Sequence, residues 1–306
     1  AFSKVLTESN TTHKSVPMLM SDITACNFDS IYHQKGIITA FKEAGYQTAF
    51  FSNQRYNHSF IDFFGKEADT FDFIKEDSLD SAYNPSDDEL LALVAKELSK
   101  GNQKQFIVLH TYGSHFNYRE RYPSEDAFFL PDYPVEAEVK YRDNLVNAYD
   151  NTIRYTDSFL SRLIHMLEEQ HVDAAMLYTS DHGEDIFDDS RHLFLHASPV
   201  PSYYQLHVPF LIWMSDTYRE AYPEHWQTVT KNKDKDLSSS RSFFPTMLEL
   251  GGVQTSYRND SSSVVSPLYT MKPRVYLNDH NEPRPLDDLG MKQPDFQKCQ
   301  VLGIKY

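Results

Sequence analysis

Short runs of apolar residues alternate with amphipathic stretches along the chain. The runs at 106–109 (FIVL) and 174–178 (AAMLY) are almost wholly apolar, and those at 46–51 and 209–213 are largely so. Continuous apolar runs of this length predict strands that are buried on both faces of a sheet. Because helical stretches separate the runs, we predict an α/β fold whose mainly parallel sheet is covered on both faces.

Amphipathic stretches that carry the signals of helices lie between these runs. Apolar side chains recur every three to four residues in them, and glycine follows two of them, where it favours helix termination. The predicted helices are residues 36–44, a helix capped by Ser86 or Asp87, residues 135–170 and residues 242–250. In contrast, the polar run at 231–240 (KNKDKDLSSS) predicts a surface loop.

Composition narrows the class of protein. The 306 residues are 40% hydrophobic, enough for a substantial core, and we expect residues 1–306 to form a single α/β domain. A net charge of −15 argues against a nucleic-acid partner, which would need clustered lysine and arginine. The sequence leaves open whether Cys26 and Cys299, its two cysteines, are bridged or free. No apolar run reaches the roughly 18 residues that cross a bilayer.

Polar side chains follow two of the predicted strands at the points where the strands end. Asp181 and His182 come after the run at 174–178, and His110 to His115 follow the run at 106–109. In open α/β sheets functional groups gather at these carboxyl ends. A carboxylate beside an imidazole suits zinc, in preference to manganese or magnesium. The alternative is a surface turn in which Asp181 caps the next helix.

Two further segments could contribute to a site. Histidines gather after Asp181, at His192, His196 and His207, and one or two of them could complete a metal site or bind phosphate, although any one of them could be a surface or core residue. Hydroxyl residues at 9–15 precede Pro17, which can lie in the first turn of a helix. Free N–H groups at a helix start attract anions, whereas an ordinary threonine cap is the other interpretation.

Four motifs taken together resemble the phosphoethanolamine transferases of bacterial envelopes, in the alkaline phosphatase and sulfatase superfamily. The resemblance runs through nearly the whole chain in the family's order. It implies a three-layer αβα sandwich of the alkaline-phosphatase type. The motifs are SDHGE at 180–184, LHTYGSH at 109–115 followed by Tyr118 and RYP at 121–123, NAYDNTI at 147–153, and THKSVP at 12–17.

The resemblance also implies roles for individual residues. Thr12 would be the nucleophile and a metal ligand, with Asp181 and His182 as further ligands of one or two zinc ions. His115 and His196 would lie at the phosphate, where His115 assists proton transfer or holds a second metal. His192 is a rival to His196, because the loop between Asp181 and His196 differs in length from that of the best-known members.

The function that the resemblance implies is transfer of phosphoethanolamine from phosphatidylethanolamine to lipid A or another envelope glycan. A phospho-threonine would be the intermediate, and the domain would work at the membrane surface on the periplasmic face of the inner membrane. Alternatives on the same fold are a glycerol phosphate transferase, a sulfatase or phosphodiesterase, and a catalytically impaired binding domain. The metal content and the modification of Thr12 would separate the last of these from the enzymes.

In the family an acidic metal ligand ends a first strand upstream of the nucleophile. No such strand precedes Thr12, and Glu8, four residues before it, does not match that motif. A central strand is hard to omit from a parallel sheet, because its neighbours would expose backbone groups. We therefore expect the natural protein to extend upstream with this strand, its glutamate and a membrane anchor.

Overall fold

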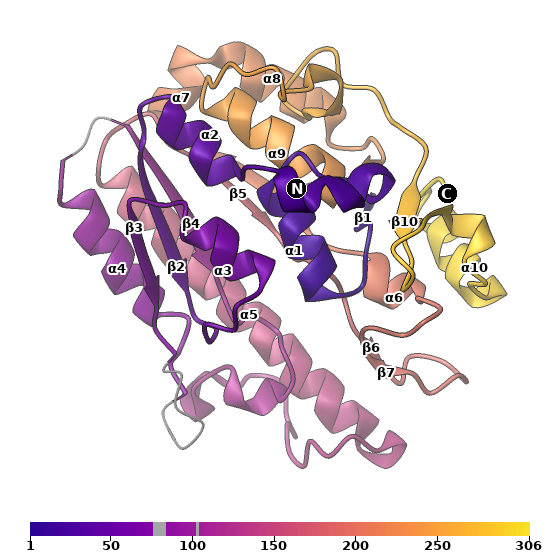
Figure 1. Ribbon diagram of the computed structural model, residues 1–306. Helices are drawn as coiled ribbons and strands as arrows, with labels where there is room; N and C mark the ends of the chain where they lie inside the picture. The colour runs from indigo at the N-terminus through magenta and orange to yellow at the C-terminus, as the bar shows by residue number, and fades with distance from the viewer. Residues whose placement is uncertain (76–83, 102–103) are drawn as a thin grey trace. The chain divides into compact units, whose positions relative to one another are not determined.

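The structure is a computed structural model that describes residues 1–75, 84–101 and 104–306 (Figure 1). The chain divides into two compact units, and it passes between them more than once. The first unit contains residues 1–45, 171–184 and 196–306, and the second contains 46–170 and 185–195.

A three-stranded parallel sheet forms the centre of the second unit, in the order β3-β2-β4. Its strands are β2 (Gln47–Ser52), β3 (Thr70–Phe73) and β4 (Gln105–His110), and the short hairpin strands β6 (Asp185–Ile186) and β7 (Phe194–Leu195) pair separately. Helices α3 (Phe60–Gly65) and α4 (Glu89–Leu98) pack against the sheet, and Gly65 lets α3 approach the Phe50 ring closely.

Helix α5 (Arg142–Glu168) is the longest helix of the second unit. Its buried side chains begin at Leu145. The helix begins at Arg142, so the prediction of a helix from 135 was wrong for the first seven residues. That segment is a loop followed by the short 3-10 helix η4 (Val139–Tyr141). The backbone just upstream is held in a non-helical path, because the Asn144 side chain donates to the Tyr133 carbonyl. No helix in the described residues is long and apolar enough to cross a bilayer.

The first unit is built from paired strands with helices around them. Strand β5 (Ala175–Thr179) pairs with β8 (Phe210–Met214) antiparallel, whereas β1 (Val5–Leu6) pairs with β9 (Leu237–Ser238) parallel. A third pair, β10 (Val275–Leu277) and β11 (Pro283–Pro285), is antiparallel. The helices are α1 (Thr12–Met20), α2 (Ile37–Glu43), α6 (Tyr203–Leu206), α7 (Asp216–Ala221), α8 (Pro223–Asn232), α9 (Ser239–Leu250) and α10 (Gln293–Val301).

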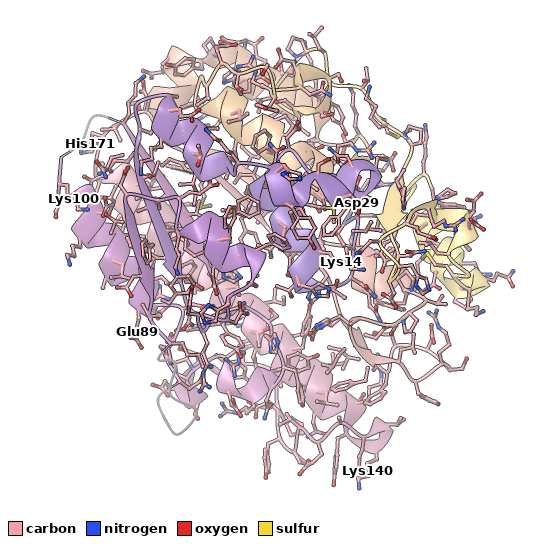
Figure 2. The ribbon with its side chains drawn as sticks, in the orientation of Figure 1. Lys14, Asp29, Glu89, Lys100, Lys140 and His171 are labelled. Carbon is pink, nitrogen blue, oxygen red and sulfur yellow. The ribbon has the colours of Figure 1, made fainter. Side chains whose placement is uncertain are left out.

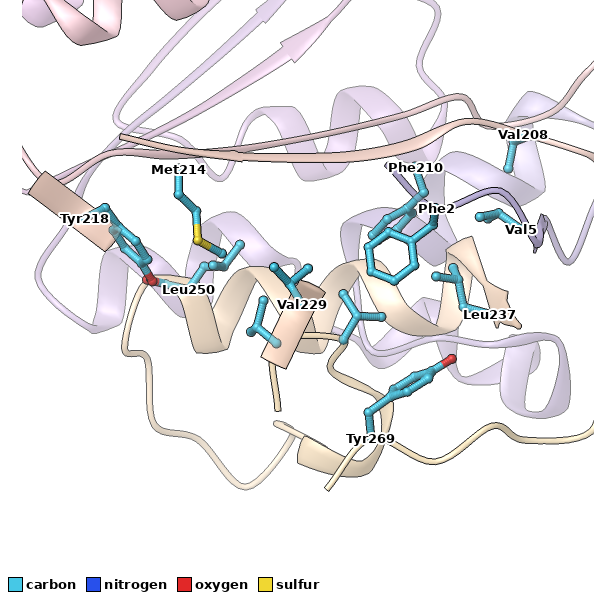
Figure 3. Packing of buried hydrophobic residues seen from close by; sticks show 12 residues of the cluster. Phe2, Val5, Val208, Phe210, Met214, Tyr218, Val229, Leu237, Leu250 and Tyr269 are labelled. Carbon is cyan, nitrogen blue, oxygen red and sulfur yellow. The ribbon is translucent and has the colours of Figure 1, made fainter. Parts of the chain in front are cut away.

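A hydrophobic core lies between β8 and the helices α8 and α9 of this unit (Figure 3). The rings of Phe2 and Phe210 meet edge to face, with centroids 5.6 Å apart. Such edge-to-face contacts add to the free energy gained by burying the two rings. Val229 of α8 and Leu250 at the end of α9 contribute from the helices. The core therefore fixes the N-terminal strand, which leads directly to Thr12.

The polar run at 231–240 is exposed in its first half, at Lys231, Lys233, Asp234 and Lys235, but buried in its second half, so the prediction of a surface loop was wrong for residues 236–240. It contains β9, and Asp236 and Leu237 are both buried. The Asp236 carboxylate lies 3.1 Å from the Arg274 guanidinium and accepts a hydrogen bond from the Lys305 backbone N–H. A long-range partner thus lets a charged residue enter the interior, and the local composition gave no sign of it.

The two apolar strands that were predicted to be buried on both faces are partly exposed. In β4 only Phe106 is buried, and all residues of β5 keep intermediate exposure. Within the described residues each strand pairs on one side only, β4 with β2 and β5 with β8. Both cysteines are free thiols, Cys26 exposed and Cys299 buried.

We expect the stability of the fold to fall between pH 4 and pH 7 in part because of Asp22. Burial raises the pKa of the Asp22 carboxyl to about 6. Since the folded-state pKa lies above the unfolded value, this group's contribution is full below pH 3.8 and is lost as the pH rises through 6. Asp22→Asn should therefore stabilise the protein by about 2 kcal/mol at pH 7 and much less at pH 4. Urea unfolding at both pH values measures this, and an equal effect at both would contradict it.

Candidate active site

Thr12 lies at the first position of α1, after Thr11 as the capping residue. The helix begins here because the Thr11 carbonyl accepts hydrogen bonds from the backbone N–H and the hydroxyl of Ser15. Pro17 lies in the interior of α1, so the prediction that it occupies the first turn was wrong. The Thr12 hydroxyl oxygen is 3.1 Å from His182 Nε2. The hydroxyl at the helix start thus faces the histidine that follows β5.

Asp181 and His182 lie in the loop after β5, as the sequence predicted. His182 Nδ1 lies 3.0 Å from the Gly183 carbonyl oxygen, which can only accept, so the ring proton is on Nδ1. The lone pair on Nε2 therefore faces Thr12, and Asp181 Oδ2 lies 3.4 Å from the same nitrogen. The N-terminal segment that precedes Thr12 fixes the backbone of this loop, because the Thr7 hydroxyl donates to the Asp181 carbonyl at 2.8 Å.

Gly183 permits the close approach of this loop to a neighbouring turn. A Cβ atom at 183 would lie 2.1 Å from the Tyr204 carbonyl oxygen and 3.1 Å from that of His207. Both neighbours are backbone atoms, so they cannot move aside by a rotamer change. The Gly183 N–H also donates to the Gln205 carbonyl at 2.9 Å. Glycine is therefore required here for contact rather than for a left-handed backbone.

We predict that Gly183→Ala displaces the loop that carries Asp181 and His182. The variant should lose about 2 kcal/mol or more of unfolding free energy, as overpacked sites do. Chemical unfolding measures the loss. Gly101→Ala is a control of a different kind. A Cβ atom at 101 would meet no other atom, so any loss of stability there reflects the strained φ of +67° and not a close contact. If Gly183→Ala were as stable as the unchanged chain, the close contact would not constrain the loop.

His196 joins the same group of residues. Its ring lies 4.0 Å from that of His182 between centroids, and its Nδ1 is 3.1 Å from Glu184 Oε1. The Glu184 side chain is almost buried, so it can hold the His196 ring in one orientation. His192, the rival in sequence, is an exposed residue of the second unit whose backbone N–H donates to the Asp189 carbonyl. The structure therefore brings His196 next to His182, which in turn faces Thr12.

Asn10 links the Thr12 segment to the His196 loop, and no sequence pattern indicates this role. Its side-chain amide donates to the Ser198 carbonyl at 3.0 Å and to Gln205 Oε1 at 2.6 Å. Its own carbonyl accepts from the Ala197 N–H, and its side-chain oxygen accepts from the Tyr276 hydroxyl. Asn10 is fully buried. The site geometry thus depends on a polar residue that is distant in sequence from most of its partners.

Glu8 takes part in a buried ion pair. One carboxylate oxygen accepts from the Ala25 N–H at 2.8 Å, and the other accepts from Ser238 and lies 3.1 Å from Arg241. Burial raises the pKa of the Glu8 carboxyl, and the Arg241 charge opposes that shift. Both oxygens have partners, which makes Glu8 a structural residue in this arrangement.

Lys14 on α1 also has a fixed partner. Lys14 is buried, and its ammonium donates to the Asn278 carbonyl at 2.7 Å. Burial lowers the pKa of Lys14, and the nearby Asp279 charge opposes this shift. The ammonium group therefore ties α1 to the strand β10 end.

His115 belongs to the second unit, in the loop after β4. The loop is held by Asp87, whose carboxylate accepts from the Tyr112 N–H at 2.7 Å and the Gly113 N–H at 2.9 Å. His115 itself is exposed, and its ring meets Tyr112 edge to face. The sequence predicts Asp87 only as a possible helix cap, but the capping residue of α4 is Asp88. The Asp87 carboxylate fixes this loop instead, a role that no sequence pattern indicates.

The residues around Thr12 fit a zinc ion in donor chemistry. No group of three or more histidine, cysteine, aspartate or glutamate side chains has metal-site spacing in the part of the chain that the structure describes. The convergent donors are two such residues, Asp181 and His182, with the Thr12 hydroxyl as a third. Their separations of 3.1 and 3.4 Å are close to the roughly 3.4 Å between ligands of tetrahedral zinc. The Nδ1–H of His182 on a carbonyl is the usual support for a metal-binding histidine.

A match to the profile of the sulfatase family extends over residues 1–253. The chain belongs to the sulfatase family. Among curated relatives, phosphoethanolamine transferase EptA of Salmonella typhimurium is 35% identical over 168 residues, which are 53% of this chain and 30% of the relative. Phosphoethanolamine transferase EptC of Escherichia coli is 24% identical over 279 residues, 88% of this chain and 47% of the relative. The chain thus spans less than half the length of these relatives.

Solved structures confirm the fold class that the sequence predicted. The C-terminal periplasmic domain of EptC from Escherichia coli, in complex with zinc, superposes with a TM-score of 0.84 at 23% identity, over 94% of this chain and 82% of that one. EptC from Campylobacter jejuni gives 0.77 at 26% identity, over 89% and 84%. The integral membrane EptA of Neisseria meningitidis gives 0.74 at 25%, over 86% and 50%. The predicted resemblance to phosphoethanolamine transferase catalytic domains is confirmed.

Proposed function

We propose that this domain transfers phosphoethanolamine from phosphatidylethanolamine to lipid A or another envelope glycan. The observation that carries the proposal is the position of the Thr12 hydroxyl, 3.1 Å from His182 Nε2 at the start of α1. A helix start offers free N–H groups and a positive dipole end, which favour a phosphoryl group at this place. The names of the similar proteins, which are phosphoethanolamine transferases, supply the transferred group.

The reaction would proceed in two displacements at phosphorus. In the first, the Thr12 oxygen attacks, the bond between phosphorus and the glycerol oxygen breaks, and diacylglycerol leaves with a proton. In the second, an acceptor hydroxyl attacks the phosphothreonine, the bond to the Thr12 oxygen breaks, and Thr12 regains its proton. Histidine exchanges protons near neutral pH, and His196 and His115 are the residues that we assign to these transfers.

Thr12, Asp181 and His182 would hold a zinc ion. Bound there, zinc would supply positive charge that favours the ionised hydroxyl and stabilises the phosphoryl oxygens. The tautomer of His182, with its proton on Nδ1, leaves Nε2 free for this purpose. A zinc complex of the similar EptC domain supports the choice of metal.

We place the domain on the periplasmic face of the inner membrane. The similar EptC domains are described as periplasmic, and the similar EptA is an integral membrane protein. A donor and an acceptor that are both lipids would then lie in the same membrane surface that the domain faces.

Intact-mass measurement after incubation with phosphatidylethanolamine in detergent tests the function directly. The expected product is the chain with one added phosphoethanolamine group, together with released diacylglycerol. Parallel incubation with phosphatidylglycerol covers the glycerol phosphate transferase alternative. An adduct from phosphatidylglycerol alone, or diacylglycerol release without an adduct on a zinc-loaded chain, would contradict the proposed donor and intermediate.

We predict that His196→Ala lowers the transfer rate by roughly 10²-fold, the usual scale for loss of a general acid or base. The variant should keep most of its zinc, because His196 is not among the three proposed ligands. His192→Ala is the matched control, since it removes the same side chain from the same loop. Transfer kinetics and zinc content of both variants measure the difference. A dead His192→Ala with an active His196→Ala would reverse the assignment.

A further inference from the structure

A short segment of the second unit exposes an unusual density of large apolar side chains. We call residues 128–139 the aromatic segment. Phe128 is 63% exposed, Leu130 65%, Tyr133 68% and Val139 47%. Scattered exposed apolar residues are normal in soluble proteins, whereas four of them within twelve residues are typical of an interaction surface.

The aromatic segment is fixed by three asparagines that lie on one face of α5. Asn144 donates to the Tyr133 carbonyl and Asn147 to the Pro131 carbonyl. Asn151, which is buried, accepts from the N–H groups of Phe128 and Phe129 at 2.9 Å each and donates to the Phe129 carbonyl. The spacing i, i+3, i+7 aligns the three along the helix. These bonds hold the apolar side chains in place, so their exposure is not the result of a loosely packed loop.

The polarity of the segment is the reverse of that in an ordinary surface loop. Its carboxylate at Asp132 is buried, where it accepts from the Tyr122 hydroxyl at 2.7 Å and lies 3.0 Å from Arg119. The rings and the leucine on either side point outward instead. A buried charged group and exposed apolar groups are suited to a surface that is transferred from water into contact with an apolar partner.

Charges of both signs border the apolar side chains. The Arg154 guanidinium lies over the Phe128 ring, 4.2 Å from its centroid, and the Lys140 ammonium, labelled in Figure 2, lies 2.8 Å from the Glu138 carboxylate. Glu136 and Glu138 are exposed on the same segment. Apolar groups flanked by a cation and by carboxylates match a zwitterionic lipid, in which a phosphate and an ammonium group lie above acyl chains.

We propose that the aromatic segment docks on the surface of a bilayer that contains phosphatidylethanolamine. The choice of lipid rests on the proposed function, whereas the surface itself rests on exposure, anchoring and charge. Tyrosine and phenylalanine favour the boundary between headgroups and acyl chains. Docking would hold the domain against the membrane that contains its donor lipid. The integral membrane protein with a similar domain makes a bilayer a better match than a protein partner.

Sedimentation with vesicles of phosphatidylethanolamine and phosphatidylcholine tests the proposal. The triple variant Phe128→Ser, Leu130→Ser and Tyr133→Ser should bind roughly tenfold or more weakly than the unchanged chain. The matched control removes exposed apolar side chains elsewhere, at Tyr257, Leu268 and Val301, and should bind as the unchanged chain does. Equal thermal unfolding midpoints for both variants show that the fold is retained.

Lipid composition and salt sharpen the result. Binding to these zwitterionic vesicles should change little between low and high salt, since apolar contact drives it. Replacing phosphatidylethanolamine with the anionic phosphatidylglycerol should weaken binding at low salt, because the chain carries a net charge of −15. Two results would overturn the proposal. One is equal vesicle binding by the triple variant and the unchanged chain. The other is that the triple variant loses self-association of the chain but not vesicle binding, which would indicate a protein contact. The assay requires no turnover. Vesicle binding that depends on the aromatic segment, without any transfer activity, would therefore count against the proposed function alone.

Discussion

Replacing Thr12 with alanine is expected to abolish the phosphoethanolamine adduct and the transfer that depends on it. The physical reason is that Thr12 supplies the hydroxyl at the start of α1 that faces His182. Alanine has no oxygen to bond to phosphorus, so no covalent intermediate can form at position 12. Intact-mass spectra after incubation with phosphatidylethanolamine should show the adduct in the unchanged chain and none in Thr12→Ala.

Thr11 provides a matched control for this experiment. It carries the same hydroxyl one residue earlier, but that hydroxyl lies 3.2 Å from Ser9 Oγ rather than beside His182. Thr11→Ala should therefore keep the adduct. Thr12→Ser should keep part of it, because the oxygen remains on a smaller side chain. An adduct that persists in Thr12→Ala and maps to Thr11 would show that the neighbouring hydroxyl is the nucleophile.

Much of the element order could be predicted from the sequence because strand and helix periodicities are local properties. The strands around 106–109 and 174–178 and the helix ending at Gly45 lie where the pattern put them. The errors came from long-range contacts. The second half of the run at 231–240 is buried, with Asp236 paired to Arg274, and the loop before α5 is shaped by asparagine side chains of the helix.

The candidate site likewise contains contacts that the sequence predicts and contacts that depend on the tertiary fold. Asp181 and His182 are adjacent in sequence and follow a strand, so their proximity needed no tertiary information. The contact of His196 with His182 did need it, because residues 183–195 separate the two histidines in sequence. Glu184 lies within the SDHGE motif, which gave a signal for its importance but none for its contact with His196. Asn10 gave no signal at all.

Loss of the Asp181 carboxylate is expected to remove most of the zinc. Asp181→Asn keeps the size of the side chain but removes the negative charge that a divalent cation requires. Changes to the outer partners of metal ligands already weaken binding by about 10- to 100-fold, so loss of a ligand should cost at least roughly 10²-fold in zinc affinity. Metal analysis of the purified variant and competition with a chromophoric chelator measure this without reference to turnover.

Two further variants place Asp181→Asn in a graded series. Ser15→Ala removes a hydroxyl whose oxygen is 3.4 Å from Asp181 Oδ2, and it should weaken zinc binding by roughly tenfold or less, because the carboxylate itself remains. Glu8→Gln tests the other acidic candidate. Since Glu8 pairs with Arg241, its loss should lower the unfolding free energy by about 3 kcal/mol while leaving zinc affinity nearly unchanged. If Glu8→Gln lost zinc and Asp181→Asn retained it, the ligand set would be built around Glu8, and the buried ion pair would have to open for the metal to bind.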